Sequence, residues 1–168
     1  RSCVKIEHAM RKRNLRDFGI ALALILLTVA VYSGVVKNEF LVYDDAPYVF
    51  ENPHLSGGFT WEAIGWAFSA DLASDSFHVD YWQPLTALSH LLDAGLFGMN
   101  PAGHHAMNLF YHALNVCLVF AVFRRATGHP WRSGLAAALM AVHPQQVEAV
   151  SWVTARKDML SGFFWMLT

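Results

Sequence analysis

The stretch FGIALALILLTVAVYSGVV, from Phe18 to Val36, decides the fold class, because its nineteen residues include no charged side chain. A helix of this length is about 28 Å long, close to the thickness of the hydrocarbon core of a bilayer. The basic segment before it resembles the start of a signal peptide, but no small-residue cleavage site follows. We therefore expect a transmembrane helix over residues 18–36, preceded by a basic cytoplasmic tail over residues 1–17.

The composition of the whole chain supports a membrane protein. Hydrophobic residues make up 55% of the 168 residues and charged residues only 15%, whereas soluble domains average about 25% charged residues. The net charge of −1 indicates no particular partner, and we expect no nucleic-acid partner. Cys3 lies in the basic tail and Cys117 in an apolar run, so we expect free thiols and no disulfide framework.

The segment of residues 37–103 contains one basic residue and nine acidic residues. Because Lys and Arg favour the cytoplasmic side, we expect the N-terminus inside the cell and this acidic loop outside. Thr60–Leu72 and Pro84–Gly98 have the caps and mixed polarity of short helices that lie along a membrane surface. The expected fold is an all-α membrane protein, a polytopic helical bundle with amphipathic surface helices in its first outer loop.

The rest of the chain predicts further helices of this bundle. Residues 104–123 form a second apolar span, and the arginine-rich residues 124–132 form a cytoplasmic turn. We expect residues 133–158 to be a helix broken at His143-Pro144, followed by an outer return segment. Residues 159–168 would begin a further transmembrane helix.

The acidic pair Asp44–Asp45 follows the first span by about eight residues. One of these carboxylates could act as a general base, or the two could supply oxygen ligands to a metal. The simpler interpretation is a pair of turn residues, because Asp before Ala-Pro is common turn chemistry. The dipeptide alone favours the turn.

Four histidines lie at or near the second span and the helix that follows: His104, His105, His112 and His143. They could bind zinc, but the compact spacing of a zinc motif is absent. Hydrogen-bonded packing between helices, together with Asn108 and Asn115, is the favoured interpretation. We assign no residue to a metal on this basis.

Arg156 and Lys157 lie on the expected outer side, where the positive-inside bias disfavours them. They could bind a lipid phosphate, or they could anchor the helix at the interface with the headgroups. Glu148 could pair with Arg156 or with a histidine, or it could simply face the interface.

These motifs occur together in the order FLVYDDAPYVFENPHL, YWQPLTALSHLLDAGLFGMNPAGHHAMNLFYHALNV, RRATGHPWRS and AALMAVHPQQVEAVSWVTARKDMLSGFFWML. The chain thereby resembles the N-terminal membrane part of the TMTC-type proteins. These are transmembrane proteins with a C-terminal tetratricopeptide-repeat region, related to protein O-mannosyltransferases of the GT-C glycosyltransferases. The resemblance covers nearly the whole chain after residue 15, but the family has more spans and a repeat region that this chain lacks.

The resemblance implies a reaction that moves a sugar, typically mannose, from a polyprenyl phosphate to a Ser or Thr hydroxyl of a protein. Asp44 and Asp45 would lie at the catalytic centre. Arg156 and Lys157 would bind the lipid phosphate. His105, His143 and Glu148 would support the site.

The cofactor implied by the resemblance is the polyprenyl-phosphate sugar donor, and a divalent metal is left open. The implied partners are membrane lipid, a protein acceptor and other membrane chains. The alternative function is a non-catalytic helical subunit, with a structural or interaction role in a larger membrane complex.

Overall fold

The computed structural model describes residues 2–69 and 82–168, with side chains described from residue 11 onward, and within these ranges it contains helices and no strand. The elements in chain order are α1 (Ser2–Tyr32), η1 (Ser33–Lys37), η2 (Ala46–Phe50), α2 (Trp61–Phe68), α3 (Pro84–Phe97), α4 (Pro101–Thr127), α5 (Pro130–Val142), α6 (Gln146–Ser151), η4 (Val153–Ala155) and α7 (Arg156–Leu167).

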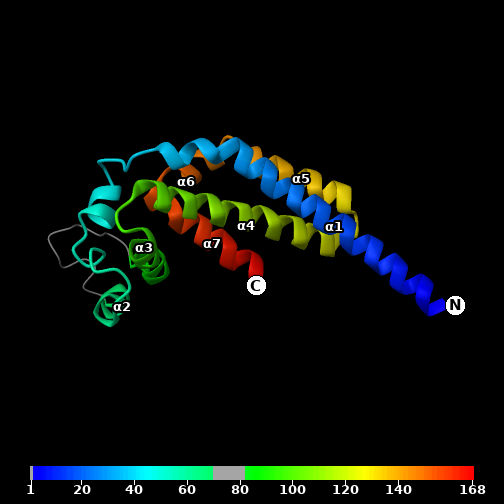
Figure 1. The fold of residues 1–168 in the computed structure, drawn as a ribbon, viewed down its shortest axis with the longest axis horizontal. Coiled ribbons are helices and arrows are strands. Elements are labelled where there is room, and N and C mark those ends of the chain that lie inside the picture. Colours follow the sequence, from blue (N-terminus) through cyan, green and yellow to red (C-terminus); the bar gives the residue numbers. More distant parts are fainter. Residues whose placement is uncertain (1, 70–81) are drawn as a thin grey trace.

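The bundle is built around α4, which packs against α1, α5 and α7 (Figure 1). At one end Arg124 near the end of α4 pairs with Asp17 of α1, with Nε and Oδ2 3.0 Å apart. At the other end the Tyr32 hydroxyl donates a hydrogen bond to the carbonyl of His143, at 3.5 Å. The helices α1 and α5 therefore run in one direction and pack against each other, and α4 runs back alongside both.

The described part of the acidic loop gathers at the end of the bundle away from the N-terminus (Figure 1). The Thr60 side chain caps α2 by accepting a hydrogen bond from the amide of Ala63, at 3.2 Å. Helix α3 begins with Pro84 and is followed by Gly98, whose φ is +61°. Both helices expected in this loop are confirmed over the described residues, and residues 70–72 of the first lie outside them.

The loop has a small hydrophobic core of its own, which includes the fully or almost fully buried Val49, Leu55, Leu91 and Val153. Three of these residues belong to the loop, and the fourth belongs to η4, about sixty residues beyond α3 in the chain. Burial of apolar side chains at this junction ties the loop to the segment between α6 and α7.

A close backbone approach positions α3 against the residues that precede α2. Gly58 has a φ of +66°, and a Cβ atom added there would lie 3.1 Å from the Cα of Gly95. The left-handed conformation and the lack of space both favour glycine at position 58.

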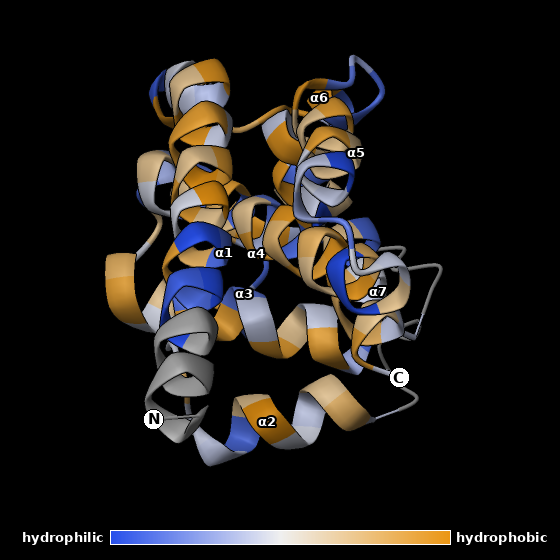
Figure 2. Cartoon of the chain, turned by 90° about the vertical axis from the view of Figure 1, so that its right-hand side faces the viewer, coloured by the Kyte–Doolittle hydropathy of each residue, from blue (hydrophilic) through white to orange (hydrophobic). Residues whose placement is uncertain are grey.

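The outer surface of the bundle is strongly apolar. Two helices, Arg11–Lys37 and Pro101–Thr127, are long and apolar enough to cross a membrane, and only 22% of the most apolar part of the first is buried inside the protein. Figure 2 shows mainly hydrophobic residues in the part of α1 that follows its basic turns, with Phe18 68% exposed and Leu26 60% exposed. Such a surface fits a lipid environment better than water, as expected of an all-α membrane protein.

Two boundaries differ from those predicted. The tail expected over residues 1–17 is helical from Ser2, because its basic residues are good helix formers and neither Gly nor Pro interrupts them. The turn expected over residues 124–132 is reduced to Gly128 and His129. There Gly128 ends α4 with a φ of +74°, and α5 begins with a proline.

The expected break at His143-Pro144 is confirmed. His143 is extended, with φ −65° and ψ 131°, and α6 begins only at Gln146. Residues 37–69, 82–100 and 143–155 thus lie at one end of the bundle, as segments on one side of a membrane would. Which side that is remains a prediction.

Candidate functional site

The two carboxylates of the acidic pair have different surroundings. Asp45 is fully buried, and its oxygens accept hydrogen bonds from the amide of Leu41 at 2.9 Å and the amide of Thr154 at 3.1 Å. The first bond closes a local turn, and the second joins the loop to η4 across 109 residues of sequence. Asp45 is therefore a structural link between these two segments.

Asp44 lies one residue earlier, partly exposed, where the chain turns into η2. Its backbone carbonyl accepts a hydrogen bond from the amide of Tyr48, at 3.1 Å. Its carboxylate forms no hydrogen bond or ion pair with the residues that the structure describes. Of the two acids, Asp44 is therefore the one whose carboxylate has no partner among the described residues.

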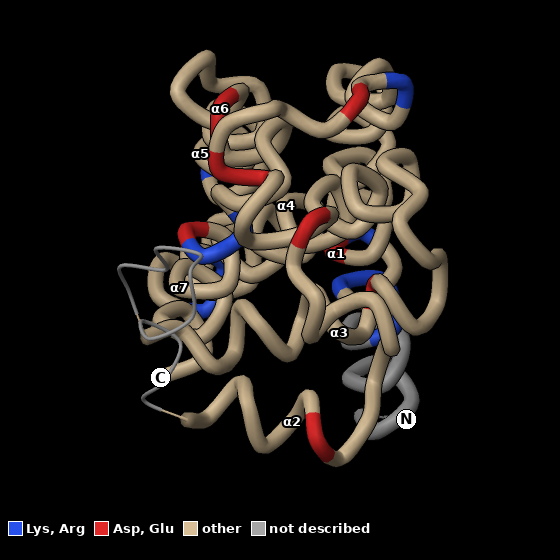
Figure 3. The backbone as a smooth tube through the Cα atoms, turned by 90° about the vertical axis from the view of Figure 1, so that its left-hand side faces the viewer, with Lys and Arg blue, Asp and Glu red and all other residues tan. Residues whose placement is uncertain are grey.

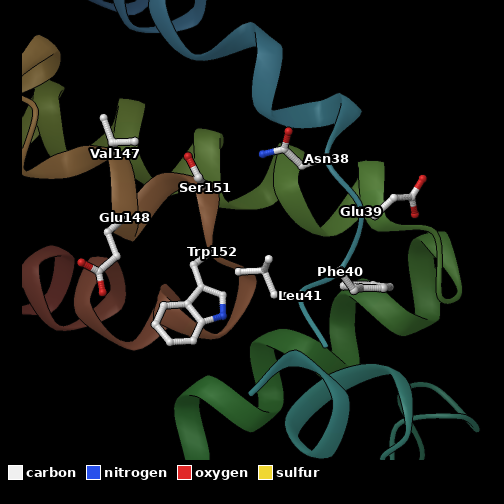
Figure 4. A pocket seen from close by; sticks show the side chains of 8 residues that line it. All are labelled: Asn38, Glu39, Phe40, Leu41, Val147, Glu148, Ser151 and Trp152. Carbon is white, nitrogen blue, oxygen red and sulfur yellow. The ribbon is translucent and has the colours of Figure 1, made fainter. Parts of the chain in front are cut away.

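A groove of about 500 Å³ runs between the start of the loop and α6 (Figure 4). Glu148 lines this groove together with Glu39, Phe40 and Trp152. Glu148 could have paired with Arg156 or a histidine, or could simply have faced the interface. Its side chain is exposed and forms no hydrogen bond with the described residues, which favours the second alternative. His143 is also exposed, and its Nδ1 accepts a hydrogen bond from the backbone amide two residues later.

The amide side chains of α4 bond to the segment that includes η4 and α7. Asn108 donates a hydrogen bond to the carbonyl of Trp152 at 2.8 Å, and Asn115 donates one to the carbonyl of Met159 at 2.9 Å. Trp152 is the non-helical residue between α6 and η4, and Met159 lies in α7, so the two amides tie α4 to both parts of this segment.

Two of the histidines also bond to backbone carbonyls of neighbouring segments. The Nε2 of His112 lies 3.2 Å from the carbonyl oxygen of Ala141, and the Nε2 of His105 lies 3.4 Å from that of Glu39. His112 thus joins α4 to α5, as the interpretation of hydrogen-bonded packing between helices predicts, whereas His105 joins α4 to the non-helical start of the acidic loop.

Arg156 is fully buried and binds four protein groups. It forms an ion pair with Asp93 through Nη1. It also donates hydrogen bonds to the Asn108 side chain at 2.8 Å, to the His104 carbonyl at 2.8 Å and to the Ser89 carbonyl at 3.4 Å. The guanidinium thus joins α3, α4 and α7 and has no surface exposed to solvent.

Burial shifts the pKa values of two groups of α3, Asp93 of this ion pair and the nearby His90. It raises the pKa of Asp93 to about 6, although the charge of Arg156 acts in the opposite direction. Burial, together with the positive charge of Arg156, lowers the pKa of His90 well below its usual value. At neutral pH the pair Asp93–Arg156 is therefore ionised and His90 is neutral.

Lys157 lies on the outer surface of α7 and, with its neighbour Asp158, lines a second groove, of about 600 Å³. Aromatic and aliphatic side chains form much of this groove, including Trp82, Leu85, Leu160 and Phe164. Figure 3 shows basic and acidic residues close together at the start of α7, in an otherwise uncharged part of the chain.

The structure brings only some of the predicted site residues together. The Thr154 amide bound by Asp45 belongs to the residue two positions before Arg156, so the acidic pair does lie close to the start of α7. Glu148 does not join them, because Asp93 takes the place beside Arg156 that was considered for Glu148. Lys157 and Glu148 line different grooves.

His90 and Asp93 were not among the residues predicted for the site. They lie three residues apart in α3, so they share a helix face. A second signal in the sequence was Arg156 itself. Basic residues are disfavoured on the expected outer side of the membrane, so an arginine there needs an acidic partner. The sequence could not show which acid, because Asp93 and Arg156 are 63 residues apart.

Comparison with known proteins identifies the family. The chain is 33% identical over 147 residues to the protein O-mannosyl-transferase Tmtc2 of Drosophila melanogaster, an alignment that covers 84% of the chain and 15% of that protein. It is 30% identical over 161 residues to the protein O-mannosyl-transferase TMTC1 of Homo sapiens, covering 92% of the chain and 18% of the relative. For the protein O-mannosyl-transferase TMTC4 of Homo sapiens the identity is 28%, with 97% and 24% covered.

The chain belongs to the TMTC family. No family model matches it, and no solved structure matches it. This TMTC chain spans between 15% and 24% of the length of the relatives named above. The two apolar helices and the TMTC relatives together indicate a membrane location, and these relatives are named protein O-mannosyl-transferases.

Proposed function

We propose that this chain forms part of a membrane glycosyltransferase that moves mannose from a polyprenyl phosphate to a hydroxyl group of a protein. The observation that supports this most directly is the division between the two acids. The carboxylate of Asp45 accepts hydrogen bonds from two backbone amides, whereas Asp44 is partly exposed and its carboxylate has no partner among the described residues. Asp44 is thus suited to be the general base and Asp45 its positioning residue.

The proposed reaction is a direct displacement at the anomeric carbon of the sugar. Asp44 takes the proton of the acceptor hydroxyl while the hydroxyl oxygen forms a bond to that carbon. The bond between the carbon and the phosphate oxygen breaks, and the phosphate leaves with the bonding electrons. The configuration at the anomeric carbon is inverted.

The groove beside Lys157 is the proposed place for the donor. A polyprenyl phosphate combines an anionic headgroup with a long apolar chain, and this groove combines one lysine with several aromatic and aliphatic side chains. Lys157 would contact the phosphate as a point charge. Arg156 would not contact the phosphate itself. Its buried ion pair with Asp93 would instead fix the start of α7, and with it the position of Lys157.

The proposed orientation follows from the same arrangement. The loop, the acidic pair and the start of α7 would lie on the extracytoplasmic side, and the basic first turns of α1 would lie in the cytoplasm. The asymmetry of Lys and Arg along the chain supports this orientation.

Transfer of mannose from a polyprenyl phosphate to an acceptor peptide by the natural protein tests the proposal. We expect Asp44→Asn to lower the rate by about 10²–10⁴-fold, the usual contribution of a general base, without changing expression or elution from a sizing column. Glu51→Gln is the matched control, because Glu51 is an exposed acid of the same loop, and we expect it to keep full activity.

Full transfer by Asp44→Asn would contradict the general-base role. The non-catalytic helical subunit would then describe the chain better. The burial of Arg156 favours that alternative, because a buried guanidinium does not present itself to a lipid phosphate.

A further inference from the structure

The interface between α3 and α4 holds a second cluster of functional groups, separate from the acidic pair. His90, Asp93 and His104 are buried there, and one potential ligand atom from each lies within 4.8 Å of the other two. We propose that these three side chains bind a zinc ion. The proposal does not depend on sugar transfer.

The hydrogen bond of His104 fixes the state of its ring. Its Nε2 lies 3.0 Å from the carbonyl oxygen of Gly98, and because a carbonyl only accepts, Nε2 must carry the hydrogen. In a neutral ring Nδ1 then presents a lone pair. This lone pair lies 3.4 Å from an oxygen of Asp93, which is also an acceptor.

That oxygen of Asp93, Oδ2, also receives Arg156, whereas its other oxygen, Oδ1, and His104 Nδ1 have no hydrogen-bond partner among the described residues. A second proton on His104 would bind Nδ1, but it would leave both ring nitrogens of His90 without a partner. A metal ion bound to His104, Asp93 and His90 uses a lone pair of each.

His90 provides the independent observation that points to a ligand. Its side chain is buried, and neither ring nitrogen has a hydrogen-bond partner among the described residues. Buried polar groups almost always have partners, so two such nitrogens on one ring need an explanation.

Asp93 can bind the metal and Arg156 at the same time. One of its oxygens, Oδ1, has no hydrogen-bond partner among the described residues, while Oδ2 receives Arg156. A metal-bound carboxylate is commonly held by such an outer hydrogen bond, which fixes its orientation. Arg156 would therefore be a positioning residue of the metal site.

The ligand set and its dimensions suit zinc. Zinc prefers nitrogen and oxygen ligands at about 2.0–2.1 Å in a tetrahedron, which places neighbouring ligand atoms roughly 3.3 Å apart. The potential ligand atoms of His90, Asp93 and His104 lie within 4.8 Å of one another, so small movements of these side chains would bring them to that spacing. Three protein ligands leave a fourth position, and because Arg156 already balances Asp93, an anionic fourth ligand such as hydroxide is favoured.

A bound water molecule is the competing explanation. It could donate hydrogen bonds to His104 Nδ1 and Asp93 Oδ1 and accept one from His90. Metal analysis distinguishes the two, since a water site does not bind zinc.

The test uses the natural protein purified in detergent, stripped with a chelator and reloaded with zinc or with cobalt as a spectroscopic probe. We expect the wild type to bind one zinc ion per chain more than a His90→Leu variant does under the same conditions. The affinity of His90→Leu for zinc should be lower by at least about tenfold. We also expect the visible absorption of four-coordinate cobalt. His112→Leu is the matched control, because His112 is a buried α4 histidine with a carbonyl partner outside the cluster.

A His90→Cys variant keeps the test decisive if His90→Leu fails to fold. A thiolate at this position should retain zinc and should add a sulfur-to-cobalt charge-transfer band, which appears only if residue 90 is a ligand. Equal zinc in the wild type and His90→Leu, or absence of that band from a folded His90→Cys protein, would overturn the proposal and favour the water.

Discussion

The two acids at the start of the outer loop should respond to substitution in opposite ways. Asp45 is fully buried and accepts two backbone hydrogen bonds, whereas Asp44 is partly exposed and forms none through its carboxylate with the described residues. We therefore expect substitutions of Asp45 to lower stability and substitution of Asp44 by Asn to leave stability unchanged.

The hydrogen bonds give the size of the effect. A hydrogen bond to a charged group contributes about 1.5–3 kcal/mol, so Asp45→Ala should cost about 3–6 kcal/mol when both are lost. In Asp45→Asn one oxygen can still accept, while the new NH₂ group faces an amide donor, so the expected cost is at least about 1.5–3 kcal/mol. Asp44→Asn should stay within about 0.5 kcal/mol of the wild type, as most surface substitutions do.

Equilibrium unfolding of the natural protein in mixed detergent and SDS, followed by tryptophan fluorescence, measures these differences. The same variants heated and then passed through a sizing column give an independent ranking. The reasoning is wrong if Asp45→Asn is as stable as the wild type. It is also wrong if Asp44→Asn is destabilised as much as Asp45→Asn, because the two side chains would then share one structural role.

Three further predictions test other parts of the molecule. Asp93→Leu and Arg156→Met should each lower the free energy of unfolding by about 3–5 kcal/mol in the same assay, because each leaves the other partner buried and unpaired. The double variant should lose much less than the sum of the two, and additive losses would contradict the ion pair. Gly58→Ala should cost about 1–3 kcal/mol because of its φ of +66° and the nearby Gly95 backbone, whereas Gly57→Ala, where only a side-chain contact at 3.9 Å is expected, should be nearly neutral. In a background without native cysteines, an impermeant thiol reagent added outside the cell should label Ser56→Cys and not Ala126→Cys, and the reverse labelling would invert the proposed orientation.

Much of the fold follows from local sequence signals. The uncharged stretches produce the two long helices α1 and α4, the Thr60 cap and Pro84 mark the starts of α2 and α3, and His143-Pro144 ends α5. Boundaries were less predictable where helix formers continue past the apolar stretch. The basic residues before Phe18 extend α1 for this reason.

The site was less predictable because its contacts are distant in sequence. The acidic pair stands out in an apolar run, but the link from Asp45 to Thr154 spans 109 residues and determines which acid remains available. The burial of Arg156 could not be read locally either, since its partners come from α3 and α4. Only its unfavourable charge for that side of the membrane indicated that it needed a partner.

The ion pair between α3 and α7 also bears on how the chain is made. Asp93 is synthesised 63 residues before Arg156, which at about 5–20 residues per second is a delay of roughly 3–13 s. During this interval α3 has a carboxylate whose final partner does not yet exist, so the helix cannot take up its buried position without leaving that charge uncompensated. The loop should dock onto the bundle only after the start of α7 has emerged from the ribosome, so the arrival of Arg156 sets the earliest moment at which α3 can be buried.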